Sequence, residues 1–259
     1  MLLETGLTGP GHAAEVKSRG DYVTATDRLS EEAILEVLAR EAPGIAILAE
    51  ERGGHRAFGG PREISAEPPI SRGKTMWAVD PLDGTTNFVH GFPSVAVSVA
   101  LLENGRPVYG VILAPFLDLE FTASHGAGAH ANGALLSALH AGDPSRAVVA
   151  TGFPFRNKQL LPRYMSMFRA ALERFEDLRR VGAAALDLAW TAAGTFGGFF
   201  ELNLNTWDVA AGALLVREVG GRVTDWSGGE TWLETGNILA GPEAVHEALL
   251  ELAAQSPDR

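Results

Sequence analysis

Carboxylates gather in three separate stretches of this sequence, each at the predicted end of a strand or start of a helix. Glu50 and Glu51 follow an apolar run, Asp80 and Asp83 lie three residues apart in "AVDPLDGTTNF", and Asp208 begins the helical pattern of "NTWDVAAG". Strand ends at one edge of an α/β sheet are where ligand crevices form. Oxygen ligands without His or Cys suit Mg²⁺ or Mn²⁺ and suit zinc poorly. The pattern predicts a site for a hard divalent cation.

The residues between and after the two aspartates predict an anion site beside this cation. Pro81 holds its backbone φ near about −65°, which stiffens the chain. Asp80, Asp83 and the carbonyl of Leu82 can then face one point. Gly84 begins a predicted helical turn, and backbone N–H groups at a helix start bind anions without a lysine. Two cations about 3.5–4 Å apart can bind the attacking and leaving oxygens in phosphoester hydrolysis.

Each acidic stretch also has an ordinary interpretation. Asp-Gly is common in turns, an aspartate at a helix start can be a cap, and paired glutamates can be a solvated strand end. Short motifs produce many false positives, and spacing alone does not show that the three stretches meet. The net charge of −11 and pI of about 5.1 disfavour direct binding to nucleic acid. A protein this acidic needs a local cation, either Arg and Lys or a metal, to handle phosphate.

Composition narrows the class of protein further. The 259 residues are 46% hydrophobic, which permits a large core in one domain or two. No apolar run approaches the length of a membrane span, and the N-terminus lacks the basic start and apolar core of a secretory signal. There is no cysteine, which excludes disulfides and thiolate metal sites. We therefore expect a cytoplasmic protein without a membrane partner.

The first half of the chain is predicted to be rich in strands. A helix begins near Ser30, which can cap it, and "IAILAE" then predicts a strand. Residues 52–74 are rich in Gly, Pro and charge, which is typical of a surface loop, with a lid as one alternative. "MWAVD" predicts the next strand. "SVAVSVALLENGRPVYGVIL" predicts two strands joined at Asn104-Gly105.

From about residue 147, strands and helices alternate. Helices are predicted over 158–175, 183–193 and 208–219, with "GGFFEL", "GRVTDW" and "NILAG" as strands. An α/β (α+β) fold with two subdomains that share an active-site cleft follows from this order. We expect an N-terminal subdomain over 1–145 with most of the metal ligands, and a C-terminal one over 146–259.

Two long stretches resemble the signatures of the inositol monophosphatase family of Mg²⁺-dependent phosphatases: "WAVDPLDGTTNFVHGFP" and "WDVAAGALLVREVGG". "DYVTATD" and "AEER" resemble the family's earlier motifs. "ATGFPFR", "RRVGAAALDLAW" and "TGNILAG" are most similar to its bacterial SuhB branch. The similarity runs from about Lys17 to the C-terminus. It implies a layered α-β-α-β-α sugar-phosphatase fold and a homodimer.

The resemblance implies two or three metal ions in each active site. Glu50, Asp80 and the Leu82 carbonyl match the family's first Mg²⁺ site, and Asp80, Asp83 and Asp208 match the second. Glu50 would also help to hold a third, weaker ion. Mn²⁺ is an alternative cofactor.

Three residues are expected to act in catalysis. Gly84 and Thr85 match the amides that bind phosphate in the family. Asp27, in "TATD", matches the acid that pairs with the Thr85 hydroxyl and helps to activate water. Glu50, Asp27 and Thr85 are therefore the implied catalytic set. No lysine or histidine base is required, because a metal ion already acidifies its water.

The alcohol part of the substrate has its own implied contacts. Glu201 lies seven residues before Asp208, as does the family's inositol-binding glutamate. An exposed strand-end acid is the alternative. Ala184 matches a backbone contact there, and Asp208 would also meet a sugar hydroxyl. The chain departs from the family at Ala49, where glycine is usual, and in a shortened first helix, which leaves the dimer contacts open.

We expect a phosphoric monoester hydrolase acting on inositol monophosphate or a similar small polyol or sugar phosphate, by direct attack of a metal-bound water. A fructose-1,6-bisphosphatase or an NADP or nucleotide phosphatase on the same metal site is the first alternative. The second is a SuhB-like partner protein in transcription antitermination and ribosomal RNA maturation. For that role, the candidate surface is a basic group: Arg156, Lys158, Arg179 and Arg180. The same group could instead accept a second phosphate or be a solvated face. Lithium sensitivity is a family expectation. The preferred substrate and the number of metals are not determined by the sequence.

Overall fold

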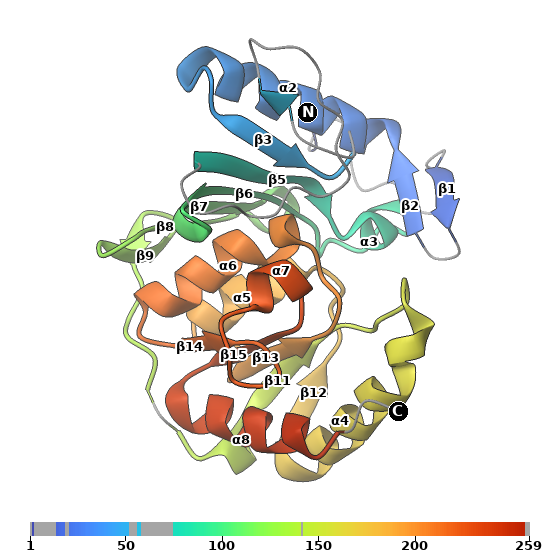
Figure 1. Cartoon of the computed structure of the whole chain (residues 1–259), viewed down its shortest axis with the longest axis vertical. Helices are drawn as coiled ribbons and strands as arrows, with labels where there is room; N and C mark the ends of the chain where they lie inside the picture. Colours follow the sequence, from blue (N-terminus) through green and yellow to red (C-terminus); the bar gives the residue numbers. More distant parts are fainter. Residues whose placement is uncertain are drawn as a thin grey trace.

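Helices and sheets alternate in five layers along the long axis of the molecule (Figure 1). A computed structural model describes residues 2, 14–18, 21–51, 56–57, 75–140 and 142–256. Helix α2 (Ala25–Glu41) covers one face of an eight-stranded sheet, and α5 (Ala184–Ala192) and α6 (Thr206–Glu218) lie against the other face. A five-stranded sheet follows, and then α4 (Leu161–Arg174) and α8 (Glu243–Ala254). This order confirms the predicted α-β-α-β-α fold.

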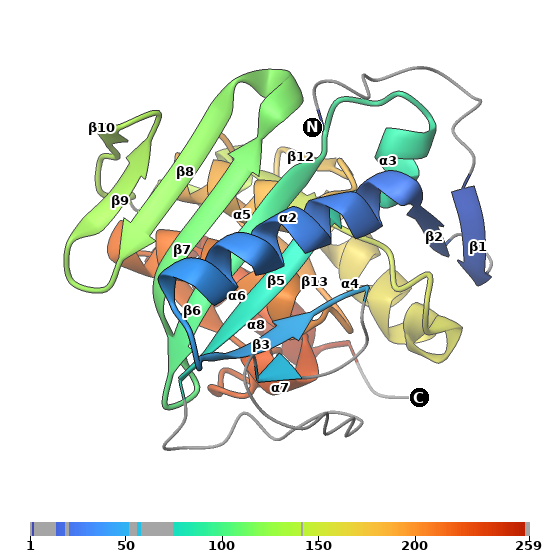
Figure 2. The same cartoon turned by 90° about the horizontal axis from the view of Figure 1, so that it is seen from above.

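The eight-stranded sheet is built mainly from consecutive antiparallel strands. Its order is β10-β9-β8-β7-β6-β5-β3-β4, and only β3 and β5 pair in parallel. Figure 2 shows α2 lying across the sheet above β5 and β6. The strands are β3 (Ala46–Ala49), β4 (Arg56–Ala57), β5 (Thr75–Asp83), β6 (Ala96–Glu103), β7 (Arg106–Ala114), β8 (Leu119–Ser124), β9 (Gly128–Ala131) and β10 (Ala134–Leu135).

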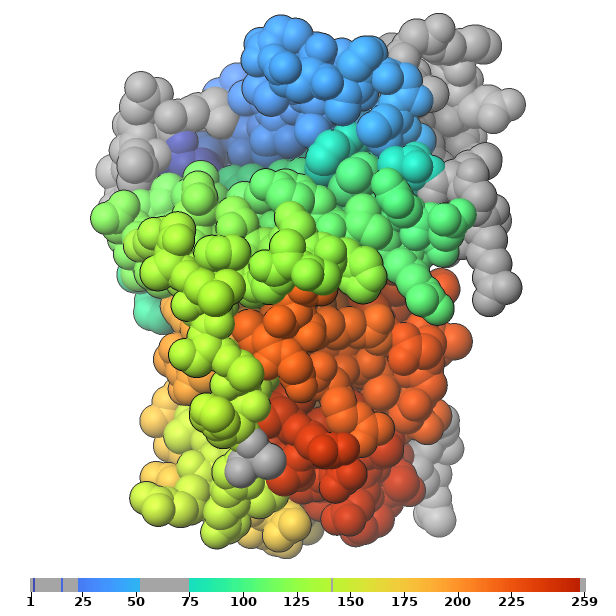
Figure 3. Space-filling view, turned by 90° about the vertical axis from the view of Figure 1, so that its left-hand side faces the viewer, coloured from blue at the N-terminus to red at the C-terminus, as the bar shows by residue number. Residues whose placement is uncertain are grey.

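The five-stranded sheet is mixed. Strand β11 pairs in parallel with β12 and β13, whereas β15 pairs antiparallel with β13 and β14. Figure 3 shows the stack from the side, with the second half of the chain below the green strands of the first sheet. The strands are β11 (Val148–Thr151), β12 (Asp177–Arg179), β13 (Gly198–Glu201), β14 (Arg222–Thr224) and β15 (Ile238–Gly241).

The remaining elements are short. Strands β1 (Ala14–Ser18) and β2 (Asp21–Thr24) form a separate two-stranded sheet. Single-turn helices occur at α3 (Thr85–Val89), α7 (Trp232–Thr235) and the 3₁₀ segments Pro115–Leu117, Pro144–Arg146 and Lys158–Leu160. In the described ranges, no helix is long and apolar enough to cross a membrane.

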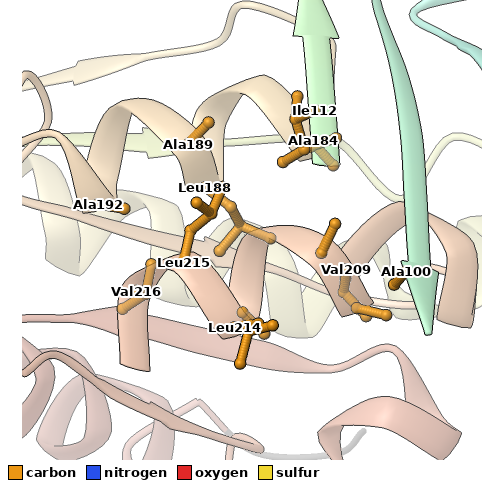
Figure 4. Packing of buried hydrophobic residues seen from close by; sticks show 14 of the residues in the cluster. Ala100, Ile112, Ala184, Leu188, Ala189, Ala192, Val209, Leu214, Leu215 and Val216 are labelled. Atoms are coloured by element: carbon orange, nitrogen blue, oxygen red, sulfur yellow. The ribbon is translucent and has the colours of Figure 1, made fainter. Parts of the chain in front are cut away.

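The core joins the two sheets through α5 and α6. Alanine and leucine side chains of these helices pack against β6 and β7 above and against the five-stranded sheet below. Figure 4 shows Leu188 of α5 between Leu215 of α6 and Ile112 of β7. At one contact the backbones approach so closely that a Cβ on Gly110 would lie 3.0 Å from the Cα of Ala211. Because α6 packs directly on the first sheet, the division at residue 145 stays an interpretation.

Most predicted elements occur within a few residues of their expected bounds, including the hairpin at Asn104-Gly105, where both residues have positive φ. The start of the first helix was wrong. Thr24 caps it in a capping box with Asp27, and Ser30 lies inside the helix, where its hydroxyl donates to the Pro81 carbonyl at 2.8 Å. Most of the predicted loop over 52–74 lies outside the described residues, although β4 falls within it.

Candidate active site

One cleft between the two sheets collects the acidic residues from all three stretches. The space without atoms in and directly above it is about 660 Å³, part of which is open to solvent. Glu50, Asp80 and Asp83 enter it from the ends of β3 and β5, Asp208 from α6, and Glu201 from β13. The other lining residues are Leu82, Gly84, Thr85, Thr86, Gly152, Phe155, Arg156, Arg180, Gly182, Ala184 and Leu204.

Local backbone geometry places the carboxylates on β3 and β5. These strands are parallel neighbours, and the Glu50 N–H donates to the Val79 carbonyl at 3.3 Å, so Glu50 lies beside the start of the motif. The pairing of β5 with β6 is interrupted between Asp80 and Asp83, as in a β-bulge. Within this bulge the Leu82 N–H donates to Asp80 Oδ1 at 3.0 Å. Proline cannot donate to the ladder, so the bulge follows from the sequence itself.

Two helix starts bring the second half of the chain to the same point. Asp208 is the third residue of α6, where its Oδ2 accepts the Asn205 N–H at 2.6 Å in a capping box. Asp83 Oδ2 accepts the Ala185 N–H at 2.7 Å, which ties β5 to the start of α5.

Burial of so many acids in one place raises their pKa values. Desolvation is the main cause at Asp80, Asp83 and Asp208, and the charges of the neighbouring carboxylates add to it at Asp80 and Asp83. The pKa of Asp83 rises to about 8. The pKa of Glu201 also rises to about 8, through burial and then the charge of Asp208. Carboxylates in such a group are stable as anions only beside compensating positive charge.

The donor set fits a hard divalent cation, since it consists of carboxylates and a carbonyl. Within the described ranges, no three Asp, Glu or His side chains are already drawn together as a metal site. Two reasons are visible. Asp83 and Asp208 each use one oxygen for a backbone N–H, and uncompensated carboxylates repel one another. Small rotations of these side chains would be needed to surround an ion.

The contact that the sequence predicted between Asp27 and Thr85 is present. The Thr85 hydroxyl lies 3.0 Å from Asp27 Oδ1 and 3.1 Å from the Leu82 carbonyl, both within donating distance. The other oxygen of Asp27 accepts from the Thr24 N–H at 2.7 Å and from its hydroxyl. Burial raises the pKa of Asp27, although these hydrogen bonds oppose the rise. The capping box of α2 thereby orients a carboxylate toward Thr85.

The glycines of the cleft allow close approach of the backbone. Gly84 has φ of +90°, and a Cβ there would lie 2.8 Å from the Ser94 carbonyl. A Cβ on Gly152 would lie 2.1 Å from Glu201 Oε1, so the missing side chain leaves room for the glutamate. Glu201 is 7% exposed. The predicted alternative, an exposed strand-end acid, is wrong for this residue.

Arg156 and Arg180 line the cleft. The sequence interpretation placed them in a basic group that could accept a second phosphate or a partner protein, but it did not place them among the cleft residues. Arg156 Nη2 lies 3.5 Å from Glu50 Oε1, and the Arg180 guanidinium lies 5.2 Å from the Phe153 ring centre. Gly152, Arg180 and Glu201 lie at the carboxyl ends of β11, β12 and β13, whose parallel pairing makes that edge a ligand crevice. The order of the strands in this sheet, had it been known, would have pointed to these positions.

Comparison with known proteins decides the family. The sequence profile described as the inositol monophosphatase family matches residues 3–258. This chain belongs to the inositol monophosphatase family.

Individual relatives carry two kinds of name. A protein from Pseudomonas aeruginosa named Nus factor SuhB is 44% identical over 236 residues, which cover 90% of this chain and 83% of the relative. An inositol-1-monophosphatase from Mesorhizobium japonicum is 40% identical over 236 residues, which cover 91% of this chain and 84% of that relative. The crystal structure of the extragenic suppressor protein suhB from Bartonella henselae superposes with a TM-score of 0.83 at 38% identity, covering 95% of this chain and 89% of that one. The predicted family and its SuhB branch are thus confirmed.

Proposed function

We propose that this protein is a Mg²⁺-dependent phosphomonoesterase that hydrolyses inositol monophosphate or a similar small polyol or sugar phosphate. The observation that carries the proposal is the single cleft in which Glu50, Asp80, Asp83 and Asp208 meet Gly84 and its neighbours. A phosphate ester is the ligand that needs both metal-binding acids and an anion-binding turn. Family membership supports a phosphatase, and the finer choice of substrate rests on the alcohol end of the cleft.

The metal ligands remain those implied by the resemblance. Glu50, Asp80 and the Leu82 carbonyl would hold one ion, Asp80, Asp83 and Asp208 a second, and Glu50 would contribute to a weaker third. When bound, Mg²⁺ supplies positive charge that neutralises phosphate and acidifies water. Mn²⁺ offers the same oxygen preference.

The protein's own groups would then bind and orient the reactants. Backbone N–H groups at Gly84 and Thr85 would donate to phosphate oxygens. The Thr85 hydroxyl, held by Asp27, would orient the attacking water toward phosphorus. No phosphoenzyme is required, because a water molecule oriented by Thr85 can attack phosphorus directly. The reaction would proceed by direct attack of water.

The alcohol end would recognise hydroxyl groups. Glu201, Ala184 and Asp208 all line the cleft, and Asp208 would meet a sugar hydroxyl as well as the metal. Arg156 and Arg180 in the same cleft favour a second candidate substrate class, a bisphosphate or an NADP-like phosphate, because a guanidinium binds phosphate well. Both substrate classes would use the same metal site, so the ranking of substrates by turnover distinguishes them.

Phosphate release from a substrate panel tests the proposal. The panel contains inositol 1-phosphate, fructose 1,6-bisphosphate, NADP, 2′-AMP and β-glycerophosphate, each with Mg²⁺ and with chelator. We expect Mg²⁺-dependent turnover, highest for inositol 1-phosphate and abolished by Asp80→Asn. The control is Asp118→Asn, an exposed residue outside the cleft whose φ of +53° asparagine also adopts. A folded, Mg²⁺-saturated protein that releases no phosphate would refute the proposal.

The names of the SuhB relatives favour a second function, as a protein partner of the transcription machinery. All four basic residues expected on such a surface are exposed. Arg156 and Arg180 also line the cleft, and Arg179 pairs with Asp177. A homodimer in the cytoplasm is proposed for either function. Binding to a purified transcription complex that survives Asp80→Asn would support this second function. Loss of binding in that variant would make it depend on the metal site.

A further inference from the structure

Asn87 joins two parts of the cleft that lie far apart in the sequence. It lies on α3, directly after the turn of Gly84, and its side chain is 8% exposed. Its Nδ2 donates to the Ser94 carbonyl at 2.7 Å and to the Val181 carbonyl at 2.9 Å. An amide NH₂ carries two hydrogens, so this group is fully used. The second bond connects residues that are 94 positions apart.

The segment held by this bond leads into the alcohol end of the cleft. Val181 is followed by Gly182 and then by Ala184, the first residue of α5. Gly182 has φ of +91°, and a Cβ on it would lie 3.2 Å from both Asn87 Nδ2 and Oδ1. The backbone of Gly182 therefore rests on the Asn87 amide, with no space for a side chain between them.

The phosphate-binding turn at Gly84 also packs near Asn87. Gly84 faces the Ser94 carbonyl that Asn87 binds, and a Cβ there would lie 3.4 Å from the Gly182 carbonyl. Gly182 thus packs on the Asn87 amide itself, whereas Gly84 packs on the Ser94 carbonyl that this amide binds. Another cross-connection is the hydrogen bond from Ala185 to Asp83, a proposed metal ligand. Asn87 is an uncharged connection that does not line the cleft.

We infer that Asn87 is a positioning residue that sets the distance between the phosphate-binding turn and the alcohol-binding segment. The inference rests on the proposed function. A substrate that uses both ends needs them at one separation, and misplacement by about 1 Å can cost up to about a hundredfold in rate. A substrate held only through its phosphate does not need that separation. Asn87 should therefore control selectivity more than the basal reaction.

The test compares inositol 1-phosphate with phenyl phosphate, which has no hydroxyl groups on its leaving group. Asn87→Asp keeps the shape but replaces the donors with an oxygen that two carbonyls repel. Asn87→Leu removes the donors without adding charge. We expect the ratio of kcat/KM for inositol 1-phosphate to that for phenyl phosphate to fall about ten- to a hundredfold in both variants. Inhibition by inorganic phosphate should change by less than about threefold, since the phosphate end remains formed.

Asn132→Asp is the matched control. Asn132 also bridges two backbone groups, accepting the Glu120 N–H at 2.7 Å and donating to the Asp118 carbonyl at 2.9 Å, but on the exposed turn after β9. It should leave the ratio unchanged. If thermal unfolding shows that neither Asn87 variant folds, Gly182→Ala is the alternative variant. It would place a methyl group 3.2 Å from the same amide and 2.6 Å from Arg180 Nη1, and it should lower the ratio in the same way.

Equal losses on both substrates, or an unchanged ratio in a folded variant, would overturn the inference while the unsubstituted protein still hydrolyses both esters. Absence of turnover in the unsubstituted protein would instead refute the proposed function, and the inference with it. A selective fall confined to the Asn87 and Gly182 variants would support the positioning role.

Discussion

Replacing Asp83 with asparagine should stabilise the protein in chelator and weaken its stabilisation by Mg²⁺. Burial, followed by the charge of Asp208, raises the pKa of Asp83 from 3.8 to about 8. The folded state therefore keeps this proton at pH values where the unfolded chain releases it, and stability falls as pH rises from about 4 to about 8. At pH 7, the pH lies about three units above the pKa of this carboxyl in the unfolded chain. Each unit is worth about 1.4 kcal/mol, so keeping the proton in the folded state costs on the order of 4 kcal/mol.

Asparagine removes this cost and keeps an oxygen that can accept the Ala185 N–H. Because Asp208 and Asp80 share the buried charge, we expect a gain of about 2–4 kcal/mol, or roughly 4–16 °C in Tm for a chain of this size. The assay is thermal unfolding in chelator at pH 5, 6, 7 and 8. The difference between the variant and the unsubstituted protein should grow with pH. With excess Mg²⁺ the order should reverse, since ligand binding to the native state stabilises it and the variant lacks one ligand.

Asp225→Asn is the matched control, because Asp225 is 8% exposed where Asp83 is 9% exposed. Burial alone would raise the pKa of Asp225, but hydrogen bonds, including that from the Thr231 hydroxyl, hold it below its usual value. This substitution should destabilise the protein at pH 7 with or without Mg²⁺. The reasoning would be refuted if Asp83→Asn lowered Tm in chelator, or if its effect did not depend on pH.

Two further predictions test other parts of the structure. The fully buried His246, whose Nε2 lies 2.8 Å from the Thr224 hydroxyl, has its pKa lowered to about 4 by burial and by Arg222. As pH falls, the unfolded chain takes up this proton before the folded protein does, so stability should be lost from about pH 6.5 toward pH 4. His246→Gln should reduce that loss, measured by urea unfolding at pH 7 and at pH 5. Equal losses in the variant and the unsubstituted protein would contradict the assignment. Gly152→Ala should displace the Glu201 carboxylate, which a new Cβ would approach to 2.1 Å, and lower kcat/KM for inositol 1-phosphate about tenfold with little change for phenyl phosphate. Equal changes for the two substrates would show that Glu201 does not bind the alcohol part of the substrate.

The sequence determined the chemistry of the site because that chemistry is encoded locally. The bulge at Pro81 follows from the missing N–H of proline, and the turn at Gly84 follows from a positive φ that glycine adopts freely. The same holds for the hairpin at Asn104-Gly105 and for Asp208 in the first turn of α6. The one clear local error, the cap at Ser30, arose because an earlier capping box competes for the start of the helix.

Tertiary structure alone decided that Gly152 and Arg180 join Glu201 in the cleft. Arg180, Gly152 and Glu201 come together because their strands are parallel neighbours in one sheet, and no spacing in the sequence specifies that order. The bond from Asn87 to Val181 likewise depends on α5 and α6 packing between the two sheets. Such contacts between distant residues are set by the burial of apolar faces. The periodicity of a segment shows which of its faces is buried, but it does not show which other element packs against that face.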